Sequence, residues 1–133
     1  MAKKAAIDQF EKYQMEFEVR SSPRILYPYL STPSGLAEWF ADDVRYNDGT
    51  FSFEWDGSES KAKLSAKKDN SMVRFQWLEG ENEGLYFQID IVQDELTADV
   101  ALVVIDHSKP DEVSSNRMLW EQQVLNLKHV IGS

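Results

Sequence analysis

The sequence of 133 residues contains no cysteine and only two histidines. Without cysteine there is no disulfide framework, no thiolate zinc site and no cysteine nucleophile, and a reducing cytoplasm is the simplest setting. His107 and His129 show no H-x-x-x-H spacing, which argues against zinc. The stretch "DDVRYNDG" also lacks the alternating oxygen ligands and terminal glutamate of a calcium loop. We therefore predict no metal and no cofactor.

Positive charge is also scarce, because 14 lysines and arginines face 23 acidic residues and leave a formal net charge of -9. Nucleic acids and anionic membranes reward clusters of lysine and arginine. We therefore predict that neither is a partner, whereas a basic ligand or protein remains compatible with the charge.

Long apolar runs are absent. The longest, "VALVVI" at Val100–Ile105, is far shorter than the roughly 20 residues that span a bilayer. The beginning of the chain, "MAKKAAIDQF", has no apolar core of the kind that a secretory signal needs. We therefore expect an intracellular protein that does not insert into membranes.

Common catalytic motifs are missing as well. The sequence has no G-x-S-x-G, no phosphate-binding loop and no G-x-G-x-x-G. Asp42 and Asp43 form an acidic pair, but neighbours at the junction of a helix and a strand point apart, whereas acid-base catalysis needs convergent groups. Asp43 is instead expected to anchor the following strand, with Arg45 or Arg74 as its partner. No catalytic residue is predicted, so a noncatalytic role is favoured.

What the sequence does contain is a repeated alternation of apolar and polar residues, as in Phe51, Phe53 and Trp55. This twofold period is typical of strands with one buried face. Turn signals such as "NDG" and "DGS" separate the strands and indicate antiparallel hairpins. The predicted strands are Tyr13–Val19, Val44–Tyr46, Phe51–Trp55, Lys61–Lys68, Met72–Trp77, Leu85–Val92 and Leu96–His107.

Helical signals occur at two places. Ser22–Pro23 and Thr32–Pro33 each combine an N-cap residue with a proline suited to the first turn, which predicts two short helices. Pro28 should kink or end the first of them. After Pro110 and Asp111, apolar residues recur at helical spacing until Gly132, which predicts a long last helix.

This order of elements predicts an α+β fold in one domain, residues 1–133, with residues 1–10 as the part that frays. The seven strands should form one antiparallel sheet. Its apolar face needs a cover, and the last helix is the only predicted element long enough to supply it.

The order of elements and several sequence words resemble the START-like helix-grip superfamily (SRPBCC). "SSPRILYPYLSTPSGLAEWF" is similar to the helix pair of that superfamily. "FSFEWDGSESKAKLSAKK", "VRFQWLE" and "LWEQQVLNLKHVIG" resemble the branch that contains activators of the heat-shock ATPase chaperone. The resemblance implies a curved seven-stranded sheet wrapped around the C-terminal helix, often with a cavity between them for a hydrophobic ligand.

Carried onto this chain, the resemblance implies a cavity lined by large apolar side chains from the strands and helices. The predicted lining is Phe17, Trp39, Phe40, Phe53, Trp55, Phe75, Trp77, Phe87, Trp120, Val124 and Leu127. The same residues would equally well fill a solid core. Arg74, Gln76, Tyr86, Gln88 and Asp90 occupy the opposite strand positions and should face solvent, unless the strand register slips by one residue.

Three functional hypotheses follow from these observations. The leading one is noncatalytic binding of a small hydrophobic molecule between the sheet and the last helix. The second is a co-chaperone-like interaction module with a filled core, in which Met118, Leu119 and Leu125 on the outer side of the last helix mark a homodimer or partner surface. The third is an enzyme of the cyclase or hydratase type, which needs a buried acid or base that the pattern does not reveal.

Overall fold

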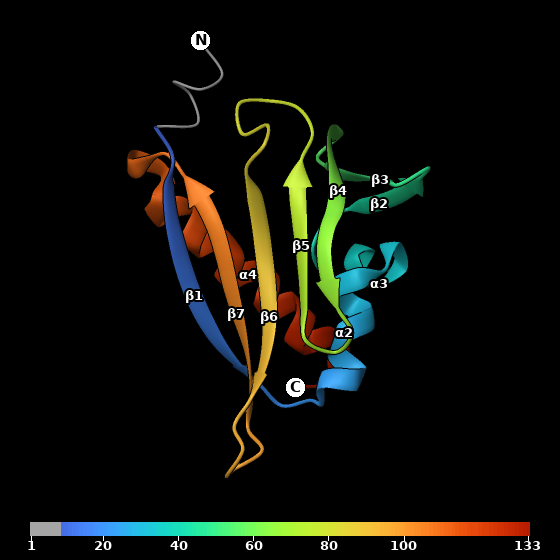
Figure 1. Ribbon diagram of the computed structural model, residues 1–133, viewed down its shortest axis with the longest axis vertical. Helices are drawn as coiled ribbons and strands as arrows, with labels where there is room; N and C mark the ends of the chain where they lie inside the picture. Colours follow the sequence, from blue (N-terminus) through green and yellow to red (C-terminus); the bar gives the residue numbers. More distant parts are fainter. Residues whose placement is uncertain (1–8) are drawn as a thin grey trace.

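The computed structural model describes residues 9–133, and the predicted frayed segment lies mostly outside these residues. The described chain forms one sheet, two short helices and one long helix (Figure 1). The strands are β1 (Glu11–Val19), β2 (Asp43–Asn47), β3 (Thr50–Trp55), β4 (Ser58–Lys68), β5 (Met72–Trp77), β6 (Tyr86–Gln93) and β7 (Val100–Ser108). The helices are α2 (Pro23–Ser31), α3 (Pro33–Ala37), the 3-10 turn η1 (Pro110–Glu112) and α4 (Val113–Ile131).

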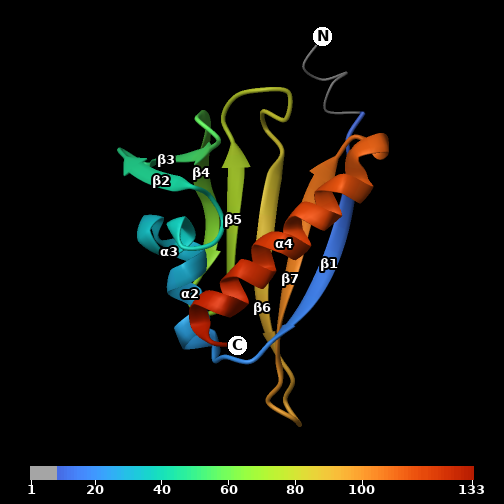
Figure 2. The ribbon, with the colours of Figure 1, turned by 180° about the vertical axis from the view of Figure 1, so that it is seen from behind.

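The sheet has the strand order β1-β7-β6-β5-β4-β3-β2, and all neighbouring strands are antiparallel. The first strand therefore returns beside the last one, with Glu11 opposite Ser108 and Val19 opposite Val100. The helix α4 runs diagonally across one face of this sheet, and α2 and α3 lie on the same side of the molecule (Figure 2). The predicted α+β helix-grip fold is confirmed.

The largest error among the predicted strand boundaries is at the start of the seventh strand. The sequence pattern starts the seventh strand at Leu96, whereas β7 starts at Val100. The carboxylate of Asp94 accepts hydrogen bonds from the backbone N–H groups of Leu96 and Thr97, at 2.8 and 2.9 Å, and so closes a turn. Leu96 is left 96% exposed at the tip of the β6–β7 hairpin.

The two short helices begin as predicted. The side chains of Ser22 and Thr32 accept hydrogen bonds from the backbone of Ile25 and Gly35, and a proline follows each cap. Pro28 does not end α2, which continues to Ser31.

The long helix α4 is the cover that the sheet requires. Trp120, Gln123, Val124 and Leu127 are its buried residues, at spacings of three and four. It ends where Gly132 adopts a left-handed conformation with a φ of 74°, which caps the helix as predicted.

The inner face of β7 changes character along the strand. Val100, Leu102 and Val104 are buried in the core, and the same twofold period then points Asp106 and Ser108 toward α4. The strand therefore carries a carboxylate into the space beneath the helix.

Candidate functional site

The centre of the interior is occupied by the ring of Phe40, which follows α3. Its centroid lies 5.0 Å from that of Phe87, 5.1 Å from Phe53 and 5.6 Å from Trp120. The Phe40 carbonyl accepts hydrogen bonds from Nε1 of Trp55 at 2.9 Å and from Nε2 of Gln123 at 2.7 Å. Phe40 thus joins the α3 segment, the sheet and α4 at one point.

The predicted lining residues lie together beneath α4 or at the margin of this core, but the rings pack on one another where the resemblance implied an open cavity. Centroid separations of 5.2 Å for Phe75 and Phe87 and 5.5 Å for Trp77 and Phe87 are ordinary packing distances. The buried ones are Trp39, Phe40, Phe53, Phe75, Phe87, Trp120, Val124 and Leu127, and the half-buried ones are Phe17, Trp55 and Trp77. Around Phe40 the interior is therefore packed with rings.

An open pocket of about 380 Å³ begins where this packing ends, between the first half of α4, the end of β7 and the β5–β6 connection. Trp77 and Trp120 from the predicted lining form part of its wall, together with Leu119. Asp106 and Ser108 contribute polar atoms. The pocket combines an apolar wall with a few convergent polar groups, which is the usual composition of a small-molecule site.

Asp106 is the central polar group of this pocket. Its Oδ2 accepts hydrogen bonds from Nε1 of Trp120 at 2.8 Å and from the hydroxyl of Tyr13 at 3.3 Å. Its Oδ1 accepts one from the backbone N–H of His107 at 2.8 Å. Burial raises the pKa of Asp106 above its ordinary value, although these hydrogen bonds partly oppose the effect.

Tyr13 is held as a neutral donor. Burial, with the nearby charge of Asp106 as the second cause, raises the pKa of Tyr13 to about 12. The phenol therefore stays protonated at neutral pH and can donate to the carboxylate, while the guanidinium of Arg117 lies over its ring at 5.2 Å from the centroid.

The rim of the pocket is also tied together by polar contacts. Nδ2 of Asn116 on α4 donates a hydrogen bond to Oγ of Ser108 on β7. Nζ of Lys109 lies 3.1 Å from Oε2 of Glu81, which joins the end of β7 to the β5–β6 connection. The first contact ties α4 to β7, and the second ties the end of β7 to the β5–β6 connection at the pocket mouth.

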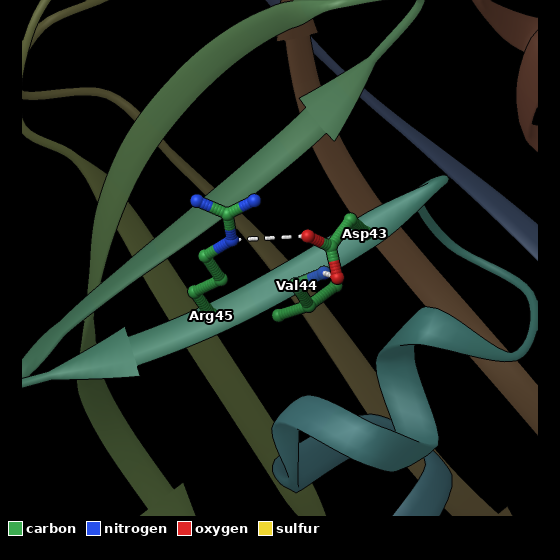
Figure 3. Close-up of polar contacts among 3 residues, drawn as sticks. All are labelled: Asp43, Val44 and Arg45. Carbon is green, nitrogen blue, oxygen red and sulfur yellow. Dashed lines mark hydrogen bonds and ion pairs between the residues drawn. The ribbon is translucent and has the colours of Figure 1, made fainter.

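The acidic pair at residues 42 and 43 has a structural role, as predicted. Asp43 accepts hydrogen bonds from the backbone of Val44 and from Nε of Arg45, both at 3.0 Å (Figure 3). Asp42 instead accepts one from the backbone N–H of Asp56 at 2.8 Å, in the β3–β4 turn. Arg45, and not Arg74, is therefore the partner of Asp43, and the two carboxylates do not converge.

The polar row on β5 and β6 lies on the opposite face of the sheet, as predicted from its alternation with Val73, Phe75 and Ile89. Nε of Arg74 donates to Oε1 of Gln88 at 2.8 Å, and Gln88 donates to Asp90 at 2.8 Å. No slip of register exposes these side chains to the pocket.

A larger open pocket, of about 560 Å³, lies between the α2–α3 junction and strands β2 to β4. Its wall includes Tyr46, Phe51 and Leu64. The charged residue in its wall is Lys67, which is exposed. None of its described lining residues is a half-buried charged group, so the pocket at Asp106 is the better candidate site despite its smaller volume.

Among residues 9–133, no group of three or more histidine, aspartate or glutamate side chains is placed to hold a metal ion. No helix in the same part of the chain is long and apolar enough to cross a membrane.

Asp106 is the site residue that the sequence analysis missed. The sequence pattern places it at the end of an apolar strand, and it is not among the predicted site residues. The signal was present, because the twofold period that buries Leu102 and Val104 also turns Asp106 inward. Its partners could not be read in this way, since Tyr13 lies 93 positions and Trp120 14 positions away along the chain.

The comparisons with known proteins agree with this fold. The model of the START-like superfamily domain matches residues 7–133, so the chain belongs to the START-like superfamily. The solution structure of a Bacteroides fragilis protein is 37% identical, with 92% of each chain covered and a TM-score of 0.64. No curated protein is similar enough in sequence to match.

Two more distant structures share the fold. The Aha1 dimer from Colwellia psychrerythraea is 20% identical, with 89% of this chain and 93% of that chain covered and a TM-score of 0.75. An uncharacterised protein from Bacillus thuringiensis is 9% identical, with 92% and 100% covered and a TM-score of 0.77. At these identities the likeness concerns the fold, and it does not transfer a function.

Proposed function

We propose that this domain binds a small, largely apolar molecule without transforming it, in the pocket between the first half of α4 and the sheet. The observation that carries the proposal is the pairing of the indole rings of Trp77 and Trp120 with the half-buried carboxylate of Asp106 in one pocket of about 380 Å³. Apolar burial would supply affinity, and the carboxylate would fix the orientation of the ligand.

The packing around Phe40 determines which part of the predicted site is available. The rings of Phe53, Phe75 and Phe87 are fully or almost fully buried against one another, and Phe87 packs on Trp77 and Trp120 of the pocket wall. The ligand would therefore lie nearer the N-terminal end of α4 than the sequence analysis predicted, and it would touch only part of the predicted lining.

Native mass spectrometry tests the proposal. Protein purified without denaturants should carry an added mass that is lost on denaturation and recovered in an organic extract. Adding the recovered molecule at about 100 times its dissociation constant should stabilise the fold by about 2.7 kcal/mol.

Two variants locate the molecule. Trp77→Leu removes a ring from the pocket wall and should lower the occupancy, whereas Tyr46→Leu removes an exposed ring from the larger pocket and should not. Loss of the molecule from the Tyr46 variant alone would place it in the larger pocket. Absence of an added mass, together with no response of the Trp120 indole N–H signal to a panel of fatty acids, aromatic alcohols and aromatic amines, would contradict the proposal.

A second candidate function is self-association through the outer face of α4. Met118, Leu119 and Leu125 are 69%, 55% and 46% exposed, so the face that they form has no cover within the described chain. A structural neighbour, the Aha1 protein of Colwellia psychrerythraea, is described as a dimer. A second copy of this chain is the partner that we propose for this face. The mass of the protein in solution tests this proposal.

The enzymatic hypothesis has gained a half-buried acid, but the side chain with a different proton affinity that contacts this acid is not part of the pocket wall. Asp106 provides a carboxyl with a raised pKa, whereas its neighbour Tyr13, which is held protonated by a pKa of about 12, is not among the described residues that line the pocket. General acid-base chemistry usually needs two groups whose proton affinities differ and whose atoms both reach the substrate. Binding without reaction therefore remains the function that we propose.

A further inference from the structure

Among residues 9–133, the carboxylate of Asp106 has polar hydrogen-bond partners and no lysine or arginine partner, and the neighbouring His107 is the basic side chain whose charge acts on it. The contacts of this carboxylate are the indole of Trp120, the hydroxyl of Tyr13 and the backbone of His107, all of which are neutral donors. Among residues 9–133, no lysine or arginine forms an ion pair with it. A carboxylate oxygen can accept two hydrogen bonds, and Oδ1 receives one, so it has room for a further donor from a ligand.

The charges around the pocket also favour a cation. Glu81 and Glu112 belong to the wall. Among the described residues, Lys109 is the only lysine that forms an ion pair with either of them, and its Nζ lies 3.1 Å from Oε2 of Glu81. Among the described residues of the wall, His107 is the basic one, and its Nδ1 is engaged with the carbonyl of Tyr86 at 2.9 Å. An anionic ligand group would therefore meet more carboxylates than basic groups.

The aromatic wall suits a cation for a separate reason. The indole rings of Trp77 and Trp120 both line the pocket, and the negative faces of aromatic rings attract ammonium groups. Burial also makes ionised Asp106 costly, and a bound positive charge offsets this cost. Carboxylate and rings thus favour the same ligand group, although they act through different physical effects.

We propose that the ligand carries an organic ammonium group, which is held by the Asp106 carboxylate beside the indole rings of Trp77 and Trp120. This inference rests on the proposed binding function and specifies the ligand class as an amine with an apolar body. The apolar body would lie against Leu119 and the tryptophan rings, while the ammonium group would donate to Asp106.

The test uses three probes of similar size and different charge: 2-phenylethylamine, 2-phenylethanol and 3-phenylpropionate. Each is titrated at pH 7 into ¹⁵N-labelled protein while the indole N–H signal of Trp120 is followed, because that N–H donates directly to Asp106. The amine should bind about tenfold more tightly than the alcohol, and the carboxylate should bind most weakly.

Two variants separate the carboxylate from general charge effects. Asp106→Asn keeps the size and one acceptor oxygen, and it should reduce the preference for the amine to about one while the alcohol still binds. Asp48→Asn makes the same change of net charge in the exposed β2–β3 turn, where the φ of 51° suits asparagine, and it should leave the preference intact.

The outcomes are distinguishable. Equal affinity for the three probes in the wild-type protein, or an amine preference that survives Asp106→Asn, would overturn the ammonium inference and leave the binding function standing. No response of the Trp120 signal to any probe up to its solubility would overturn both. The wild-type comparison needs no variant, so the inference can be judged even if Asp106→Asn fails to fold.

Discussion

A single residue, Asp106, gives this interior its chemical character. The sheet face on which it lies is otherwise built from residues such as Leu102 and Val104, which are completely buried. A carboxylate at this position is costly unless hydrogen bonds or a counter-charge compensate it. Trp120 and Tyr13 supply the hydrogen bonds, and this explains why an indole and a phenol converge on the same oxygen.

The raised pKa of Asp106 predicts how stability depends on pH. A raised folded-state pKa means that the folded protein holds this proton more tightly than the unfolded chain does. The resulting contribution is fully present below the ordinary pKa of aspartate, about 3.9, and is lost as the pH rises through the raised value. Asp106→Asn removes this titration.

We therefore expect the free energy of unfolding of Asp106→Asn, relative to the wild type, to increase as the pH rises from about 4 to about 7. Urea unfolding followed by tryptophan fluorescence at several pH values measures the difference. Asp48→Asn is the control, and its difference from the wild type should change little over this range because the residue is exposed. A difference for Asp106→Asn that is constant or falls with pH would contradict the assignment.

At the scale of elements, the close approach of α2 and α3 depends on Gly35. A Cβ atom at this position would collide with the carbonyl oxygen of Pro28 and would lie 2.7 Å from Cα of Tyr29, both of them backbone atoms. The φ of Gly35 is not positive, so the requirement concerns space and not backbone conformation. Backbone atoms cannot swing away as a side chain would, so the helices themselves would have to move.

Gly35→Ala should therefore destabilise the protein, by about 1–3 kcal/mol for the overpacking. The opposite sign would be expected from helix propensity alone, which favours alanine over glycine by up to about 1 kcal/mol. Chemical unfolding measures the outcome, with Ser34→Ala on the exposed side of α3 as the control. A stabilised Gly35→Ala variant would show that α2 and α3 are not in close contact.

At the scale of the whole molecule, the open question is whether the outer face of α4 pairs with a second copy. Changing Met118 and Leu125 together to glutamine should convert a dimer to a monomer, because the change removes the apolar area that pairing would bury. Since both side chains are exposed, stability should change by less than about 0.5 kcal/mol. Light scattering across a concentration series gives the mass.

The matched control changes Ile25 on α2 and Leu96 in the β6–β7 turn, which are 53% and 96% exposed, to glutamine and should leave the mass unaltered. Each copy carries a formal net charge of -9, so we also expect added salt to strengthen pairing by screening repulsion. A wild-type protein that is monomeric at the highest concentration reached, with and without salt, would rule out self-association through this face.

The accuracy with which the sequence predicts secondary structure differs from element to element. The twofold period identified every strand, because one buried face imposes alternation, and the helix caps at Ser22 and Thr32 were correct. The start of β7 was wrong because the side chain of Asp94 bonds to the backbone and forms a turn that hydrophobicity alone does not predict.

The sequence by itself determined the kind of each strand and α-helix, the face that each of them buries and the anchoring role of Asp43, since these depend on residues close together along the chain. Only the tertiary structure decided that Phe40 fills the centre of the interior and that Tyr13, Asp106 and Trp120 meet at one pocket. The physical reason is that periodicity fixes the direction of a side chain relative to its own strand or helix. The angle at which α4 crosses the sheet, and hence which inward residues touch, is set by the packing of the whole core.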